Sequence, residues 1–327
     1  AATLKTQHEE RRAEKLTAIR RRMRGSFPRR LTASTPSAAT EAVETGAIQR
    51  RLDADPSAVP IMLWDCGGSA SCSSPDLIFS SQSDASGYDL DAQSDEVQMM
   101  VYTTAQMANM MSSLTNGVVS NYKRSADADF YWDTYVNVDM DNAYYHEDKV
   151  VFGTGYVVDD VIAHEWMHGY IEYGPGYLYE YQPGALNEAV ADIFGEALDI
   201  LNEEFTVEPD HTARTTTSEQ CTRDYHYSAE PDGSDISRRW IIGDDIPTIP
   251  LGIRDMYQPV CFWFPDWTGS GNYFCGNNIN DALSENDDHG GVHFNSNIIN
   301  RIFALMVDGG VYVHGIDTNI GAIGMVK

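Results

Sequence analysis

The stretch VIAHEWMHGYIEYG, residues 161–174, places two histidines four positions apart with a glutamate between them. On an α-helix, His164 and His168 lie on one face, so both imidazoles can bind one metal ion. Glu165 lies about 100° further round the helix axis, where it can contact a water on that ion but is poorly placed to bind the ion itself. The motif is short and also occurs in helices with two ordinary histidines, so a third ligand has to decide between the two interpretations.

A second stretch supplies that third ligand. Residues 184–195 read GALNEAVADIFG, in which apolar side chains flank Glu188. A buried carboxylate is rarely left without a partner, which makes a plain surface glutamate a poor explanation. Asp192 lies one turn further on the same face, where it can accept the outer N–H of a ligating histidine. His164, His168 and Glu188 therefore predict a hydrolytic zinc site with one position open to water.

The elements that must position these side chains are those of a mixed α and β protein. Short apolar runs predict strands at residues 60–66, 135–140 and 149–155. Apolar residues at helical spacing predict helices at 96–114, from about 185 to 203 and from about 295 to 307. Polar or irregular composition predicts a linker at 26–45, a loop at 73–95 and a long irregular insert near 206–286.

The net charge of −27 is distributed unevenly. Residues 1–51 hold twelve of the 22 Lys and Arg residues but five of the 49 Asp and Glu residues. A very acidic body repels nucleic acid, so we expect no nucleic-acid partner. The basic arm either binds an anionic surface or is a solvated helix left from a pro-region. No apolar run approaches the ~18 residues of a membrane span.

Five cysteines fit an oxidising compartment better than a reducing one. Cys66 and Cys72 flank a GGSAS segment and are close enough in sequence to close a small loop, and Cys261 and Cys275 are a second candidate pair. Cys221 is left over, which weakens the pattern. Reduced, buried thiols are the open alternative for all five.

The pair HEWMH and GALNEAVAD resembles the thermolysin-like neutral zinc metallopeptidases, the gluzincins with a His-Glu-x-x-His motif and a downstream glutamate. Three further segments resemble that family in the same order: DNAYYHEDKVVFGTG at 141–155, GIRDMYQP at 252–259 and DDHGGVHFNSNIINRIF at 287–303. The resemblance covers roughly residues 95–327. It implies an α+β fold with two lobes, a mainly β N-terminal lobe and an α-helical C-terminal lobe that is incomplete here.

The resemblance also implies a role for individual residues. Glu165 is the general base, and the metal ligands are the three named above. Tyr179, or a neighbouring tyrosine of YLYEY, and His293 donate hydrogen bonds to the oxyanion, and Asp288 orients His293. Substrate binding falls to further residues: Asn142, the backbone of Ala143, Arg254, and an apolar pocket of Val161, Ile242 and Ile253.

Calcium is a further implication of the resemblance. Asp160, Asp199 and Asp244 stand where family members hold a calcium ion beside the active-site helix, and carboxylates are the ligands calcium prefers. Arg239 and Ile241 stand where further acidic ligands are expected. The sequence is therefore compatible with one calcium ion and argues against two.

These observations predict three regions: a basic arm at 1–45, a mainly β lobe with one helix at 46–158, and the zinc-binding helices with the incomplete α-helical lobe at 159–327. They predict a secreted, monomeric endopeptidase that cleaves polypeptides through a zinc-activated water and prefers a bulky apolar residue after the scissile bond. The alternatives are a catalytically silent zinc-binding or adhesion protein on the same scaffold, and an acidic structural protein with a fortuitous motif.

Overall fold

A computed structural model describes residues 59–81, 90, 93–119, 121–122, 131–201, 238–249, 252–257, 262–264, 272–274, 288–311 and 319–320. The basic arm, Cys221, Cys261, Cys275 and most of the long insert lie outside these residues, so their predictions are not tested. The described part is an α+β fold, as predicted. None of its helices is long and apolar enough to cross a membrane.

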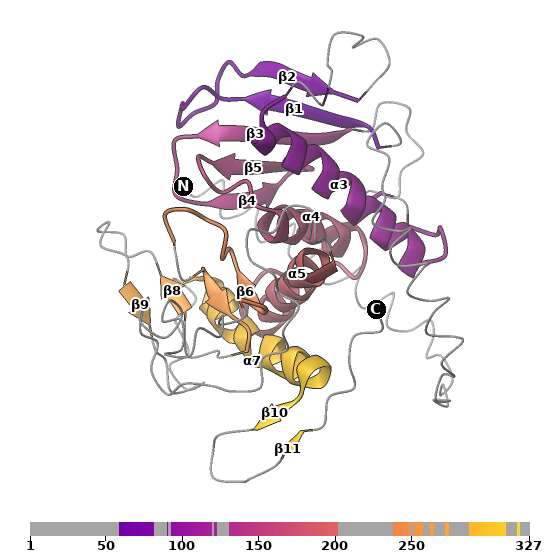
Figure 1. Cartoon of the computed structure of the whole chain (residues 1–327), viewed down its shortest axis with the longest axis vertical. Coiled ribbons are helices and arrows are strands. Elements are labelled where there is room, and N and C mark those ends of the chain that lie inside the picture. Colours follow the sequence, from indigo (N-terminus) through magenta and orange to yellow (C-terminus); the bar gives the residue numbers. More distant parts are fainter. Residues whose placement is uncertain are drawn as a thin grey trace, which may run out of the picture.

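The upper layer in Figure 1 is a five-stranded mixed sheet with the order β2-β1-β3-β5-β4. Strands β1 (Ile61–Asp65), β3 (Trp132–Val138) and β5 (Lys149–Gly153) are parallel neighbours. Strands β2 (Asp76–Ser80) and β4 (Ala143–His146) pair antiparallel at the two edges. The central strand β3 alternates buried and half-buried residues, as expected where two faces of a sheet differ in their cover.

Two strands of this sheet, β2 and β4, were not predicted from the local sequence pattern. Residues 73–95 were predicted to be a loop, but they contain β2, whose run DLIFS is too short to show a clear alternation and forms by pairing with β1. The connection between the two predicted strands contains β4, which forms a hairpin with β5.

Helix α3 (Asp95–Leu114) agrees with the predicted helix at 96–114. Ser94 caps it by accepting a hydrogen bond from the backbone N–H of Val97 at 3.4 Å. Its methionines fill the core, with Met100 and Met107 fully buried. The helix contacts both β1 and α4.

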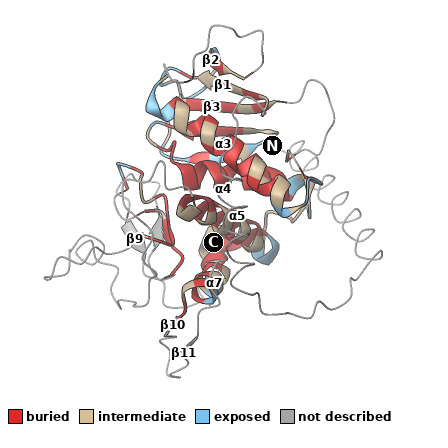
Figure 2. Ribbon diagram, turned by 45° about the vertical axis from the view of Figure 1, so that its right-hand side comes forward, coloured by how far each residue is buried: buried red, intermediate tan, exposed pale blue. Residues whose placement is uncertain are grey.

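Helix α4 (Asp159–Tyr173) carries the first motif and is buried on nearly every face. Figure 1 shows α4, α5 (Tyr181–Leu201) and α7 (Asp288–Asp308) following one another below the sheet, and the neighbouring helices pack together. In Figure 2 the buried residues run from the sheet through α4. A side chain at Gly195 would meet the backbone oxygen of Asp160 at 2.6 Å, so this glycine permits the close approach of α5 to α4.

Small strands complete the lower part of the molecule. Strands β6 (Ile241–Ile242), β7 (Arg254–Asp255), β8 (Phe262–Phe264) and β9 (Asn272–Phe274) form a second antiparallel sheet. Strands β10 (Gly310–Val311) and β11 (Asn319–Ile320) form a hairpin after α7. The sheet that begins with β6 contacts α5, which brings Arg254 toward the second helix of the site.

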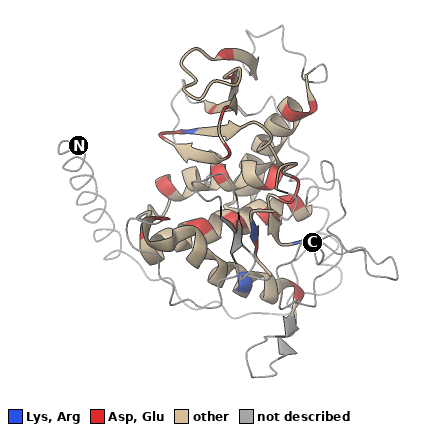
Figure 3. Cartoon of the chain, turned by 90° about the vertical axis from the view of Figure 1, so that its left-hand side faces the viewer, with Lys and Arg blue, Asp and Glu red and all other residues tan. Residues whose placement is uncertain are grey.

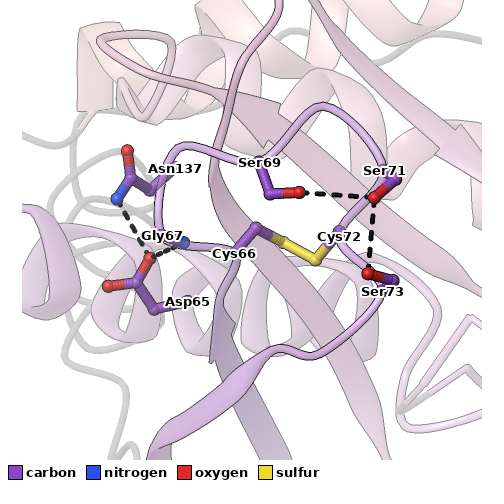
Figure 4. The surroundings of a disulfide bond; sticks show 8 residues. All are labelled: Asp65, Cys66, Gly67, Ser69, Ser71, Cys72, Ser73 and Asn137. Atoms are coloured by element: carbon purple, nitrogen blue, oxygen red, sulfur yellow. Dashed lines mark hydrogen bonds between the residues drawn. A yellow bond between two sulfur atoms is a disulfide. The ribbon is translucent and has the colours of Figure 1, made fainter.

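Cys66 and Cys72 form a disulfide, which confirms the first predicted pair (Figure 4). The loop that it closes follows β1 directly. Asp65 accepts hydrogen bonds from the backbone N–H of Gly67 at 2.7 Å and from the side chain of Asn137 at 3.0 Å, which ties the loop to the end of β3. Acidic side chains are spread over the described elements, where basic ones are few (Figure 3).

Candidate metal centre

The three predicted metal ligands meet at one point. The Nε2 atoms of His164 and His168 lie 3.0 Å apart, and the carboxylate of Glu188 lies 3.5 Å from the first and 3.4 Å from the second. Ligand atoms about 2.1 Å from a tetrahedral metal are separated by about 3.4 Å. Of the residues that the structure describes, these three form the one group of three His, Cys, Asp or Glu side chains able to hold a metal ion.

The outer nitrogen of each histidine lies close to a side-chain oxygen, which favours one orientation of the ring. Nδ1 of His164 lies 2.9 Å from Asp192, and Nδ1 of His168 lies 2.8 Å from the Oδ1 atom of Asn187. When both Nδ1 atoms carry the proton, both Nε2 lone pairs face the same point. Two lone pairs at 3.0 Å repel each other unless a cation lies between them, so the donor set fits a metal ion.

The charges around the site also favour a cation. Glu188 is fully buried, and its Oε2 atom has no hydrogen-bond partner in the described part of the chain. Burial raises the pKa of Glu188, but the neighbouring His293, His168 and His164 outweigh burial and hold it well below the usual value. Glu188 is therefore an anionic ligand. A buried anion with an unpartnered oxygen is a position that a divalent cation can stabilise.

Tyr179 and His293 lie against the same carboxylate. The Tyr179 hydroxyl donates to Oε1 of Glu188 and lies 3.2 Å from Nε2 of His293, which itself lies 3.4 Å from that oxygen. Burial, followed by the charge of Glu188, raises the pKa of Tyr179 well above its usual value, so the hydroxyl stays protonated. Of the tyrosines in YLYEY, Tyr179 is thus the one that meets His293.

Asp288 contacts His293 through both its backbone and its ring. Its carboxylate lies 2.5 Å from Nδ1 of His293 and accepts the backbone N–H of the same residue at 3.0 Å. Burial lowers the pKa of His293, but Glu188 and then Asp288 outweigh it and raise the pKa, which favours the protonated donor. Helix α7 opens with four residues at positive φ, Asp288 to Gly291. A side chain at Gly290 would meet the ring of Tyr181 at 2.4 Å, so this turn requires glycine.

Glu165 is buried on α4, next to the first ligand. Its place in the sequence sets it one step round the helix from His164, as the motif requires. Glu165 is the last of the influences that raise the pKa of Tyr179, after burial, Glu188 and Asp288.

The predicted substrate-binding residues fall into two groups. Asn142 is exposed and precedes β4, and Ala143 is the first residue of that edge strand, which lies beside α4. Val161 and Ile253 belong to one apolar cluster. Ile242 does not join them, because its side chain packs in a second cluster with Trp240 and Met256. The backbones of Ile242 and Ile253 meet through a hydrogen bond of 2.6 Å from the N–H of Ile253 to the carbonyl oxygen of Ile242.

Arg254 contacts a residue of the metal centre, and its predicted role in substrate binding stays a prediction. It is buried and donates to both oxygens of Asp192, from Nε at 2.9 Å and from Nη2 at 2.6 Å. The two donor atoms are therefore engaged with the residue that supports His164. Burial raises the pKa of Asp192, but Arg254 outweighs it and, with His164, lowers that pKa to about 2.

The predicted calcium ligands do not form a metal-binding group in the described residues. Asp160 instead accepts the backbone N–H groups of Val161 and Gly243. Arg239 is buried and lies 2.9 Å from the carboxylate of Asp308 at the end of α7. The oxygens of Asp160 are thus already satisfied by backbone donors, and the structure gives no support to a calcium ion shared by Asp160, Asp199 and Asp244.

Two residues of the site escaped the sequence interpretation. Asn187 accepts at His168, and Asn300 on α7 donates to Asp192 at 2.7 Å. Asparagines have no spacing rule that marks them as metal-site partners. The position of Asn187, immediately before the candidate ligand Glu188, was the one available signal.

Comparison with known proteins gives an independent assignment. Residues 176–326 match the family model described as the thermolysin metallopeptidase, alpha-helical domain. A zinc metalloproteinase from Renibacterium salmoninarum is 31% identical over 182 residues, or 55% of this chain and 27% of that protein. An extracellular metalloprotease from Pectobacterium carotovorum subsp. carotovorum is 28% identical over 178 residues, or 51% and 43% of the two chains.

A thermolysin from Alicyclobacillus acidocaldarius subsp. acidocaldarius is 27% identical over 197 residues, or 57% of this chain and 28% of the relative. The chain thus spans less than half the length of each of these relatives. Among solved structures, the precursor of protealysin from Serratia proteamaculans has a TM-score of 0.49 at 20% identity, covering 76% of this chain and 68% of that one. The family model, these relatives and the ligand geometry agree in one respect: the chain is similar to the thermolysin-like metallopeptidases.

Proposed function

We propose that this protein is a zinc-dependent endopeptidase. The observation that carries the proposal is the convergence of His164, His168 and Glu188 on one point, with Tyr179 and His293 beside it. A silent metal-binding scaffold has no need of the last two side chains. The relatives are named as zinc metalloproteinase, extracellular metalloprotease and thermolysin, which supports the same activity.

The residues of the site have complementary tasks in peptide hydrolysis. A bound zinc ion would supply Lewis acidity, which activates water and polarises a carbonyl. Glu165 accepts the proton of the attacking water and passes it to the leaving amine. Tyr179 and His293 donate hydrogen bonds to the oxygen on which negative charge develops, and Asp288 holds His293 in the orientation that this requires.

We propose that substrate binds along β4 as an added strand. This strand is at the edge of the sheet, so one row of its backbone groups faces away from β5. Its neighbour α4 carries the metal ligands. Val161 and Ile253 belong to one apolar cluster, and a pocket that opens at these two residues would favour a bulky apolar side chain after the scissile bond.

We also propose that the protein acts outside the cell on polypeptides. The Cys66–Cys72 disulfide is a bond that persists in oxidising compartments, and one relative is named as extracellular. A monomer is the expected oligomeric state.

The test is hydrolysis of casein by the purified chain before and after a zinc chelator, followed by zinc return. We expect activity that disappears with chelation and comes back with zinc. Zinc binding without cleavage would favour the silent scaffold instead. A folded protein that binds no zinc would reject both assignments and favour a fortuitous motif.

A further inference from the structure

Asp192 contacts more donor atoms than the one His164 nitrogen whose proton it fixes. Four donors contact its two oxygens: Nδ1 of His164 and Nη2 of Arg254 at Oδ1, and Nε of Arg254 and Nδ2 of Asn300 at Oδ2. Asp192, Arg254 and Asn300 are all buried. Arg254 already balances the negative charge of Asp192. Asn300 is neutral, so its hydrogen bond fixes the orientation of the Asp192 carboxylate without changing the net charge.

The chemistry of the Asn300 amide determines its orientation. Its Nδ2 atom lies 2.7 Å from Oδ2 of Asp192, whereas its Oδ1 atom has no partner in the described residues. The opposite orientation would place a carbonyl oxygen against a carboxylate oxygen, which is repulsive. Asn300 must therefore act as a donor.

Asn300 links a third helix to the metal centre. It lies on α7, which also carries His293, while Asp192 and Glu188 lie on α5 and His164 lies on α4. Helix α7 thus contacts the two α5 carboxylates of the metal centre, Glu188 through His293 at 3.4 Å and Asp192 through Asn300. One helix therefore helps to place both His293 and Asp192, the residue that supports the ligand His164.

We propose that Asn300 is a positioning residue that keeps Asp192 directed at His164. This inference rests on the proposed zinc site. Two of the donors at Asp192 belong to the single guanidinium of Arg254, which comes from β7. Asn300 supplies a further donor from α7, so the carboxylate is fixed from two elements and the His164 ring keeps the direction of its Nε2.

The test compares Asn300→Leu with Asn297→Leu in the full chain. Asn297 lies one turn earlier on the same helix, is also buried, and has no hydrogen-bond partner for either amide atom in the described residues. Each apoprotein is titrated with zinc against a chromogenic chelator. We expect Asn300→Leu to weaken zinc binding by about tenfold or more and to raise KM, and Asn297→Leu to leave the zinc affinity unchanged.

Asn300→Asp is the second variant, because it keeps the shape and replaces the donor with a carboxylate facing Oδ2 of Asp192. We expect at least the same loss of zinc affinity. Circular dichroism identifies which variants fold, and either folded variant decides the question. Equal zinc affinity in wild type and the folded Asn300 variants overturns the inference and leaves the proposed function intact. An equal loss in Asn297→Leu also overturns it, since it would report packing alone. A wild type without zinc affinity instead rejects the proposed function.

Discussion

The sharpest prediction concerns the hydroxyl of Tyr179. Tyr179→Phe removes one of two donors that converge beside Glu188, the other being Nε2 of His293 at 3.2 Å from the lost oxygen. A donor aimed at a developing oxyanion contributes about 3–4 kcal/mol to transition-state stabilisation. We therefore expect kcat to fall by about 10²–10³-fold, because each 1.36 kcal/mol is about tenfold in rate.

The assay is hydrolysis of a chromogenic peptide amide under zinc saturation, with kcat and KM measured separately. A loss in kcat with little change in KM is expected, because the hydrogen bond strengthens only as charge develops. The hydroxyl also donates to the Glu188 carboxylate, so the zinc content of the variant must be measured. The raised pKa of Tyr179 further predicts that the wild-type enzyme retains this donor through the alkaline range.

Two neighbouring tyrosines serve as matched controls. Tyr177→Phe and Tyr181→Phe remove the same atom within the same short segment, and neither hydroxyl contacts His293 in the described structure. We expect both variants to stay within about threefold of wild type. A Tyr179→Phe enzyme that keeps a third or more of its kcat would refute the reasoning, as would a larger loss in Tyr177→Phe.

Three further predictions follow from the same geometry. Glu165→Gln should retain zinc and the fold but lose turnover by at least about 10²-fold, and normal activity of the zinc-loaded variant in the casein assay would reject the general base. Burial and then Asp159 raise the pKa of Asp160 from 3.8 to about 8. Folding therefore opposes its ionisation, and the melting temperature of wild type should fall relative to Asp160→Asn as pH rises from about 4 to 8. If the difference between the two melting temperatures stayed constant from about pH 4 to 8, this prediction would be wrong. Arg239 stands where a further acidic calcium ligand was expected, and it already pairs with Asp308. Removing calcium with EGTA should therefore shift the melting temperature by less than about 2 °C. A larger drop that added calcium restores would support a calcium site.

Local pattern was sufficient for the elements that carry strong periodicity. Helix α3 was predicted to within a residue because the helical spacing of its apolar residues is a local signal. Strand β2 was missed because five residues with no clear alternation form a strand only when β1 is present to pair with them. The disulfide was predictable as a candidate from spacing, although spacing alone cannot distinguish it from two thiols.

The sequence by itself determined the chemistry of the metal centre. His164 and His168 must share a helical face because 3.6 residues make a turn, and Glu188 must find a partner because an apolar helix buries it. The tertiary structure decided which groups complete the site. Whether Arg254 reaches Asp192, whether Ile242 joins Val161, and whether Asn300 reaches the centre all depend on how α7 and the β6–β7 strands pack on α5. Such contacts join residues more than 60 positions apart, so no local periodicity could specify them.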